Sequence, residues 1–187
     1  GFIGLGRMGG NMVRRLSKAG HQCHVHSANQ TTREALAKEV GTVSYADIGS
    51  LVAALAAPRV VWLVVPAGEV TEQVLTELGQ LCTSGDVIID GGNSHFKESV
   101  ARAQMLAAKG ILMVDCGTSG GVFGLARGYS LMLGGANEAI GRIVPILDTL
   151  APGIEAAART PARDGGPQAP GEAGWLHCGK PGSGHYV

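Results

Sequence analysis

The sequence Gly4-Leu5-Gly6-Arg7-Met8-Gly9 joins the apolar pair Phe2-Ile3 to a segment of helical character at residues 9–19. Between a strand and a helix, such glycines allow a tight turn and let backbone N–H groups approach a pyrophosphate. We therefore predict that these six residues bind a dinucleotide. The alternative is a glycine-rich strand-to-helix turn that binds no ligand.

Short β-branched segments alternate with helical segments along the rest of the chain. We predict strands at 2–3, 23–26, 60–65, 87–90, 111–115 and 130–133, and helices at 9–19, 31–39, 47–55, 69–81, 96–109 and 137–150. Gly20, Gly41 and Gly110 stand where helix C-terminal caps are expected. This alternation predicts an α/β fold with a doubly wound, Rossmann-like, mostly parallel sheet.

The chain divides into three parts by composition. Residues 1–150 form the predicted dinucleotide-binding domain, and residues 151–174 are so rich in Pro, Gly and Ala that we interpret them as a loop or linker. Residues 175–187 are predicted to be a terminal strand and loop. Because residue 1 is Gly and only three residues precede the glycine loop, we expect the natural chain to begin earlier.

Charge and cysteine content exclude several classes of protein. The 187 residues carry 15 Lys+Arg and 15 Asp+Glu with no basic stripe, so we expect neither nucleic acid nor a membrane surface as partner. The apolar runs are far shorter than the roughly 18 residues that span a bilayer. Four scattered cysteines and the pair His24 and His26 form no recognisable metal or disulfide pattern, which favours a cytoplasmic protein without a metal.

The second predicted strand lacks the carboxylate that binds the ribose of NAD, since Ser27-Ala28-Asn29 stands there. A hydroxyl, an amide and the nearby Arg33 are compatible with a 2′-phosphate, so NADP is mildly favoured and NAD stays open. Thr31 and Glu34 match a capping box and are predicted to cap the following helix.

Three further loops follow predicted strands and are expected to converge on one crevice. They are Val65-Pro66-Ala67-Gly68, Asp90-Gly91-Gly92-Asn93-Ser94 and Cys116-Gly117-Thr118-Ser119-Gly120-Gly121. We predict that Asn93 contacts cofactor and substrate, and that Ser119, Gly120 and Gly121 bind substrate. Alternatively, Asn93-Ser94 only starts a helix and Ser119-Gly120-Gly121 is only a turn. Cys116 is interpreted as a buried thiol without a role.

These four loops together resemble the decarboxylating 6-phosphogluconate dehydrogenases, within the β-hydroxyacid dehydrogenases. The resemblance implies that Val65, Pro66 and Ala67 contact the cofactor on its nicotinamide side. Asp90-Gly91-Gly92-Asn93 favours this branch, because other members have a different loop there. The resemblance implies oxidation of 6-phosphogluconate by NADP or NAD and decarboxylation to ribulose 5-phosphate in the pentose phosphate pathway. Residues 182–187 resemble the segment before the family's catalytic lysine, which would follow Val187, so Lys180 is not that lysine.

The resemblance also implies a helical domain beyond Val187 that carries a catalytic glutamate and most of a homo-oligomer interface. We therefore expect residues 1–187 alone to be inactive, with no catalytic residue among them. Two alternatives stay open: a nucleotide-binding module that never catalyses, and a dehydrogenase of another 3-hydroxyacid.

Overall fold

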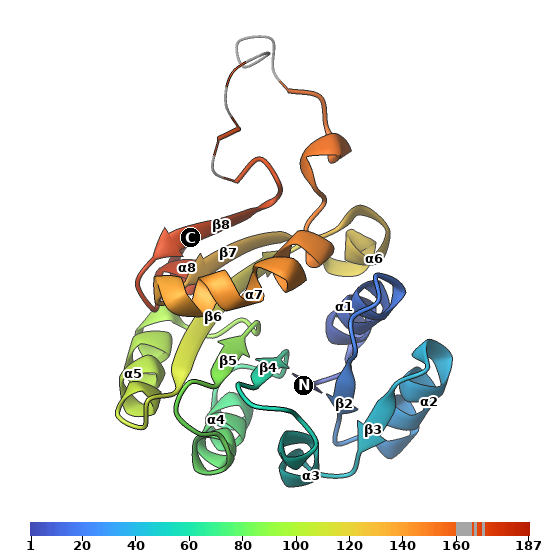
Figure 1. Ribbon diagram of the computed structural model, residues 1–187, viewed down its shortest axis with the longest axis vertical. Coiled ribbons are helices and arrows are strands. Elements are labelled where there is room, and N and C mark those ends of the chain that lie inside the picture. Colours follow the sequence, from blue (N-terminus) through green and yellow to red (C-terminus); the bar gives the residue numbers. More distant parts are fainter. Residues whose placement is uncertain (160–165, 167, 170) are drawn as a thin grey trace.

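A computed structural model of the chain describes residues 1–159, 166, 168–169 and 171–187. Its centre is one eight-stranded sheet of order β3-β2-β1-β4-β5-β6-β7-β8 (Figure 1). The strands are β1 Phe2–Ile3, β2 His24–His26, β3 Val43–Tyr45, β4 Val60–Leu63, β5 Val87–Asp90, β6 Leu112–Ser119, β7 Ser130–Gly134 and β8 Trp175–Gly179. All pairs from β3 to β6 are parallel, β7 is antiparallel to β6, and β8 is parallel to β7. The predicted doubly wound, mostly parallel sheet is confirmed.

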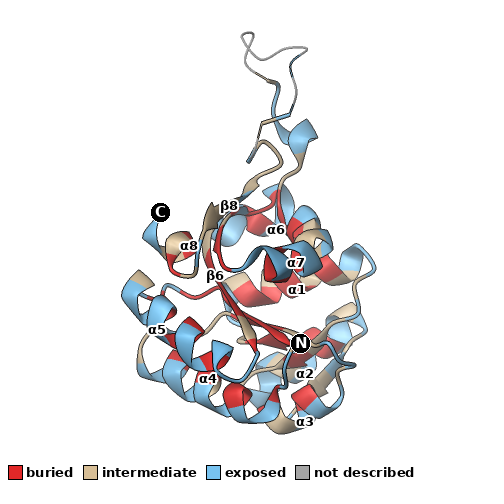
Figure 2. Cartoon of the chain, turned by 60° about the vertical axis from the view of Figure 1, so that its left-hand side comes forward, coloured by how far each residue is buried: buried red, intermediate tan, exposed pale blue. Residues whose placement is uncertain are grey.

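Helices cover both faces of the sheet. They are α1 Arg7–Lys18, α2 Gln30–Val40, α3 Ile48–Ala53, α4 Glu69–Leu81, α5 Phe96–Ala107, α6 Gly124–Arg127, α7 Asn137–Leu150 and α8 Ser183–Tyr186, with 3₁₀ turns η1 Gly121–Phe123 and η2 Ile154–Ala156. One core cluster contains the buried residues of α1, α2 and α7, and a second contains those of α3, α4 and α5. In Figure 2 the helices are buried where they face the sheet and exposed on their outer sides.

The alternation of side chains along each strand builds these two cores. On β4, Trp62 joins the α1 and α7 side, whereas Val61 and Leu63 join the α3 and α4 side. On β5, Ile89 joins the α1 and α7 side and Ile88 joins the α3 and α4 side. A strand with both faces covered needs apolar residues at every position, which explains the uninterrupted apolar runs of these strands.

Several predicted boundaries are confirmed and others are wrong. The bounds of β5, α4 and α7 agree with the prediction to the residue. Strand β3 was not predicted, because three residues with one exposed Val give little signal. Strand β6 runs four residues beyond the predicted end at Asp115, because its pairing with β7 continues to Ser119. The predicted terminal loop contains helix α8.

Residues 151–159 lead away from the body of the domain, and residues 171–174 lead back to β8 (Figure 1). Where they leave, the Gly153 N–H donates to the Ala173 carbonyl over 2.9 Å, and the Leu131 N–H donates to the Gly174 carbonyl over 2.9 Å. Further out, Arg159 pairs with Glu172 at 2.5 Å. These bonds form a neck between the sheet and the rest of the segment.

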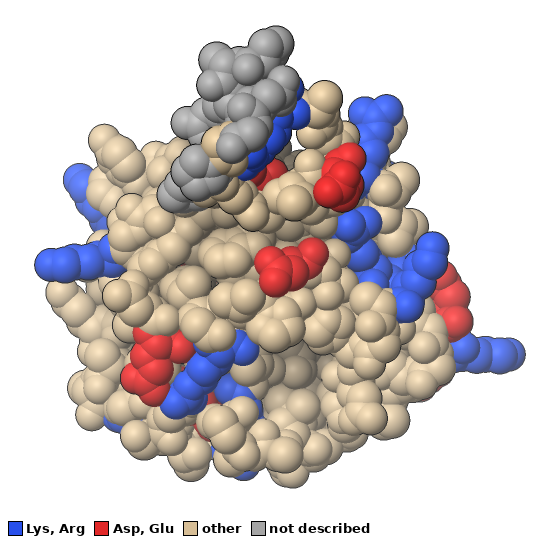
Figure 3. Space-filling view, turned by 45° about the horizontal axis from the view of Figure 1, so that its top comes forward, with Lys and Arg blue, Asp and Glu red and all other residues tan. Residues whose placement is uncertain are grey.

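The surface mixes charges of both signs. On the face shown in Figure 3, Lys and Arg side chains are interspersed with Asp and Glu and separated by uncharged surface. Over the described part of the chain, none of the helices has the length and apolar character needed to traverse a bilayer.

The N-terminal ends of β4 and β5 are joined by the half-buried Arg59 and the buried Asp86. The Asp86 carboxylate accepts from the Arg59 N–H at 2.7 Å, from the Arg59 guanidinium at 3.0 Å and from the Thr83 N–H at 2.8 Å. Burial raises the pKa of Asp86, but these hydrogen bonds and the Arg59 charge outweigh it and hold the pKa below its ordinary value. The ionised carboxylate therefore stabilises the fold.

Asp86→Asn is expected to lower the free energy of unfolding at pH 7 by about 2 kcal/mol, because a buried charge pair loses one partner. Since the folded-state pKa is depressed, the contribution is complete above an unfolded-state pKa of about 3.9 and is lost as the pH falls through the lower folded-state value. Urea unfolding from pH 7 down to pH 3 should show the variant and the wild type converging. Glu138→Gln, in an exposed pair with Arg142, is the control, and a pH-independent difference would contradict the assignment.

Candidate functional site

The glycine loop between β1 and α1 has a backbone that only glycine permits at two positions. Gly4 has φ +93°, and a Cβ there would lie 2.2 Å from the Val64 carbonyl oxygen. A Cβ on Gly9 would lie 2.1 Å from the Gly4 oxygen, so the helix packs directly on the loop. Leu5 is buried, whereas Gly6 and Arg7 are exposed. The loop is thus fixed by the fold, and its outer part faces solvent.

Gly6 differs from Gly4 and Gly9 because neither the backbone conformation nor the packing requires a glycine at this position. Its φ is −61°, and a Cβ there would have no atom within 4 Å. Gly6 is the N-cap of α1, no side chain caps this helix end, and its first turn holds no acidic residue. Free N–H groups at an uncapped helix N-terminus with open space before them fit a pyrophosphate.

The end of β2 carries the residues predicted to face the adenosine ribose. Asn29, and not Thr31, is the N-cap of α2, because its side-chain oxygen accepts from the Thr32 N–H at 2.9 Å. The predicted capping box is therefore wrong, and Glu34 accepts instead from Gln30. The Arg33 guanidinium donates to the Ser27 carbonyl at 3.2 Å, which places a cation beside Ser27 and Ala28.

The two histidines of β2 are engaged by β3. The His26 ring Nδ1 donates to the Tyr45 carbonyl at 3.0 Å, and the His24 Nδ1 lies 2.8 Å from the Tyr45 hydroxyl. Burial lowers the pKa of His24. Both rings therefore hold the edge of the sheet together.

The loops after β4 and β5 lie side by side. The Gly91 N–H donates to the Leu63 carbonyl at 2.8 Å, and a Cβ on Gly92 would lie 2.9 Å from the Val65 oxygen. Pro66 and Ala67 are exposed, and the Pro66 carbonyl accepts from the Thr71 hydroxyl at 2.9 Å. The structure thus brings two of the predicted loops into direct contact.

Asp90 folds the loop that follows it. Its carboxylate is fully buried and accepts from the Gly92 N–H at 3.0 Å and from the Ser94 hydroxyl at 2.7 Å. Asn93 lies between these two buried residues but is itself exposed. Within the described ranges no hydrogen-bond partner of the Asn93 amide is found, so its donor and acceptor are available to a ligand.

The segment predicted to bind substrate ends β6. Ser119 is the last residue of that strand and not part of a loop, and it is exposed together with Gly120 and Gly121. The two glycines have φ +142° and +49°, and the ring of buried Tyr129 lies beneath Gly120. Burial raises the pKa of Cys116 to about 12, which makes it an unreactive thiol.

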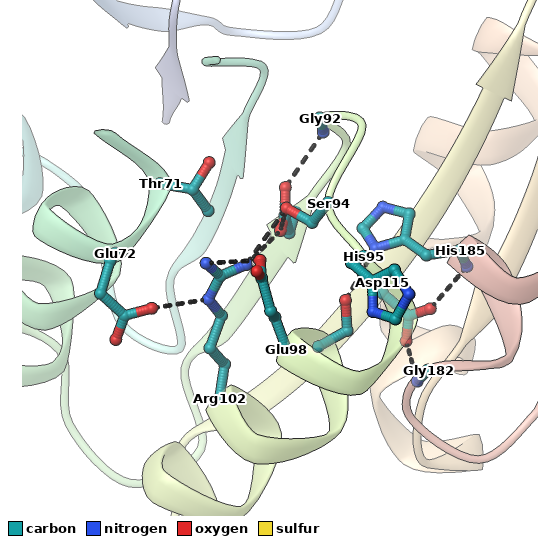
Figure 4. A network of polar contacts seen from close by, with 12 residues as sticks. Thr71, Glu72, Gly92, Ser94, His95, Glu98, Arg102, Asp115, Gly182 and His185 are labelled. Carbon is teal, nitrogen blue, oxygen red and sulfur yellow. Dashed lines mark hydrogen bonds and ion pairs between the residues drawn. The ribbon is translucent and has the colours of Figure 1, made fainter. Parts of the chain in front are cut away.

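Two residues in the site received no role from the sequence. Asp115 is buried on β6 and accepts from the N–H groups of Gly182 at 2.6 Å and His185 at 2.9 Å, so it holds α8 at the sheet (Figure 4). Arg102 of α5 is buried among three carboxylates. Two features of the sequence could have drawn attention to them: Asp115 is a charged residue at the end of an apolar run, and Arg102 follows Glu98 by four residues.

Comparison with known proteins agrees with this geometry. A family described as the NAD binding domain of 6-phosphogluconate dehydrogenase matches residues 1–158. A relative from Haloferax volcanii, the NAD(+)-dependent, decarboxylating 6-phosphogluconate dehydrogenase, is 38% identical over 187 residues, covering 100% of this chain and 55% of the relative. The decarboxylating 6-phosphogluconate dehydrogenase of Schizosaccharomyces pombe is 38% identical over 191 residues, covering 100% and 36%.

Solved structures show the same fold. The 6-phosphogluconate dehydrogenase of Plasmodium falciparum, described with NADP+ and with 6-phosphogluconate, has a TM-score of 0.81 and 26% identity, covering 99% of this chain and 38% of its own. The 3-hydroxyisobutyrate dehydrogenase of Mycobacterium tuberculosis, described with L-serine, has a TM-score of 0.80 and 25% identity, covering 99% and 55%. The chain thus spans about half the length, or less, of these relatives. On the match over residues 1–158, this chain belongs to the family of NAD binding domains of 6-phosphogluconate dehydrogenase.

Proposed function

We propose that this chain is the cofactor-binding part of an oxidoreductase that converts 6-phosphogluconate to ribulose 5-phosphate and carbon dioxide. The observation that carries the proposal is the open, uncapped N-terminus of α1 at Gly6, in a domain whose Asp90 loop presents Asn93 to solvent. The relatives named above support the substrate. The parent protein is proposed to be a cytoplasmic homo-oligomer.

In this proposal each loop has one task. Residues 4–9 bind the pyrophosphate, residues 27–29 face the adenosine ribose, and residues 65–67 lie beside the nicotinamide, which accepts the hydride when the cofactor is bound. Asn93 donates and accepts hydrogen bonds between cofactor and substrate. Ser119, Gly120 and Gly121 hold the substrate, with two backbone N–H groups and a hydroxyl in reach of its oxygens.

We propose that the proton transfers use groups outside residues 1–187. Cys116 is buried as a thiol, and Lys180 precedes residues 182–187, the segment that resembles the one before the family's catalytic lysine. We therefore propose that this chain binds and orients cofactor and substrate while a lysine and a glutamate further along the parent protein act as base and acid.

Calorimetric titration of this chain with NAD and with NADP tests the cofactor part. We expect saturable binding of at least one, and Arg33→Ala should weaken NADP more than NAD if the guanidinium beside Ser27 meets the 2′-phosphate. No binding of either dinucleotide would contradict the proposal.

A second candidate substrate is another 3-hydroxyacid, because the structure of a 3-hydroxyisobutyrate dehydrogenase superposes equally well. Assays of the full-length parent with 6-phosphogluconate and with 3-hydroxyisobutyrate distinguish the two. Carbon dioxide release with the first supports the proposal, and turnover of the second alone would replace it. A parent protein that binds dinucleotide but turns over neither would be a non-catalytic module.

A further inference from the structure

Arg102 stands out as a buried cation that the proposed function does not use. Its side chain is 4% exposed, in the middle of α5 and one turn beyond Glu98. A buried guanidinium loses its hydration, so it needs several acceptors around it. Its partners come from three different parts of the chain.

The guanidinium joins α4, α5 and the loop after β5. Its Nε donates to Glu72 at 2.8 Å, its Nη1 donates to the Ser94 hydroxyl at 3.2 Å and lies 3.8 Å from the Asp90 carboxylate, and its Nη2 lies 3.1 Å from Glu98. Figure 4 shows Arg102 between Glu72 on one side and Ser94 on the other. Glu72 belongs to the first turn of α4, directly after the Val65 to Gly68 loop.

Both loops that meet Arg102 are held by their own side chains as well. Thr71, next to Glu72, donates to the Pro66 carbonyl, and Asp90 accepts from Gly92 and Ser94 on both sides of Asn93. A displacement of α4 therefore moves the Pro66 loop, and a displacement of Asp90 moves Asn93. Arg102 is the one described side chain that bonds to both systems.

We propose that Arg102 is a positioning residue that sets the distance between the Pro66 loop and Asn93, and thereby shapes the nicotinamide half of the cofactor site. This role rests on the proposed function, in which these two loops flank the nicotinamide. The adenosine half, formed by residues 4–9 and 27–29, has no bond to Arg102. A positioning role for Arg102 therefore predicts weaker binding of the nicotinamide half alone, whereas a general loss of stability would weaken the binding of both halves.

The chain offers a matched control in Arg59. Arg59 and Asp86 join the N-terminal ends of β4 and β5, opposite the ends that carry the ligand loops, with a guanidinium to carboxylate distance of 3.0 Å. Removing Arg59 leaves the buried Asp86 carboxylate without its cation, as removing Arg102 does for Asp90. Only one of the two pairs lies at the ligand loops.

The experiment compares NAD or NADP, whichever the wild type binds more tightly, with the matching ADP-ribose or its 2′-phosphate, which lacks nicotinamide. We expect Arg102→Met to weaken dinucleotide binding about tenfold, or about 1.4 kcal/mol, while ADP-ribose binding changes less than about twofold. Arg59→Met should lower the urea midpoint and leave both affinities unchanged. Calorimetry gives the affinities on the intact chain.

Glu72→Ala provides a second variant that folds, because Glu72 is 52% exposed and Asp90 keeps its partner Arg102. It should weaken dinucleotide binding about threefold, with ADP-ribose again unaffected. An equal loss for both ligands, or no loss for either, would overturn the positioning role while leaving the proposed function intact. A wild type that binds neither ligand would overturn the proposed function and this role together.

Discussion

Gly6→Val is expected to abolish dinucleotide binding and to leave the fold intact. The Cβ position of Gly6 is open in all directions within 4 Å, and its φ of −61° suits any residue. Its replacement should therefore change the free energy of unfolding by no more than about 1 kcal/mol, the scale of a helix N-cap substitution. In the proposed site the same space receives the pyrophosphate, so the added side chain excludes the ligand from the N–H groups of α1.

The expected loss of affinity is at least about a hundredfold, equivalent to about 2.8 kcal/mol. Gly141→Val is the matched control, because Gly141 is an exposed glycine of α7 that also has no atom within 4 Å of its Cβ position. Calorimetry with dinucleotide and urea unfolding should be done on both. If Gly6→Val binds the dinucleotide like wild type, the pyrophosphate lies elsewhere. Gly4→Val would be uninformative, because strain at φ +93° affects the fold itself.

Asp115→Ala is expected to cost about 3 kcal/mol of unfolding free energy, the largest stability effect among the substitutions considered. Its buried carboxylate accepts two backbone N–H groups, from Gly182 and His185, and hydrogen bonds to a charged group contribute about 1.5–3 kcal/mol each. Without it, the two donors of α8 lose their acceptor at a place where water has little access. Asp115→Asn should cost about 2 kcal/mol, because an amide supplies one oxygen and turns an N–H₂ group toward the other donor.

Asp148→Asn is the control for this series, since Asp148 is exposed and an amide oxygen still accepts from the Trp175 indole. Hydrogen exchange should show faster exchange of the Gly182 and His185 amides in both Asp115 variants before global unfolding. Overlapping unfolding curves for wild type and Asp115→Ala would contradict the view that this carboxylate holds α8. In the full-length parent, loss of this anchor should also lower kcat, because α8 leads toward the proposed catalytic lysine.

Elements whose sequence patterns are local could be predicted from the sequence, whereas elements that depend on pairing with distant residues could not. Helices α4 and α7 have periodic apolar patterns and β5 begins with an uninterrupted apolar run, so the limits of all three were predicted correctly. The end of β6 was missed because Gly117, Thr118 and Ser119 have loop-like composition, and only their pairing with β7 keeps them extended. Strand β3 is short and forms because β2 offers it an edge.

In the candidate site, too, features with a local sequence pattern could be predicted and features that depend on distant partners could not. The loops after β1, β4 and β5 lie where their glycines predicted them, and their contacts with a ligand stay predictions. Asn29 stays a predicted cofactor contact, and its side-chain oxygen also caps α2, a role that the sequence did not indicate. Asp115 and Arg102 went unassigned because their partners lie 67 and 30 residues away in the sequence. Such partnerships depend on the tertiary fold, and no local pattern encodes them.

The neck at Gly153 and Ala173 makes the length of the segment beyond it nearly irrelevant to the rest of the domain. Because Gly153 and Ala173 hydrogen-bond to each other beside the sheet, the two ends of the intervening chain are held together whatever its length. The entropy of closing such a loop grows only with the logarithm of its length, by about 0.6 kcal/mol for each doubling. Insertions there should thus be tolerated at small thermodynamic cost, while β7, β8 and α8 keep their places at the site.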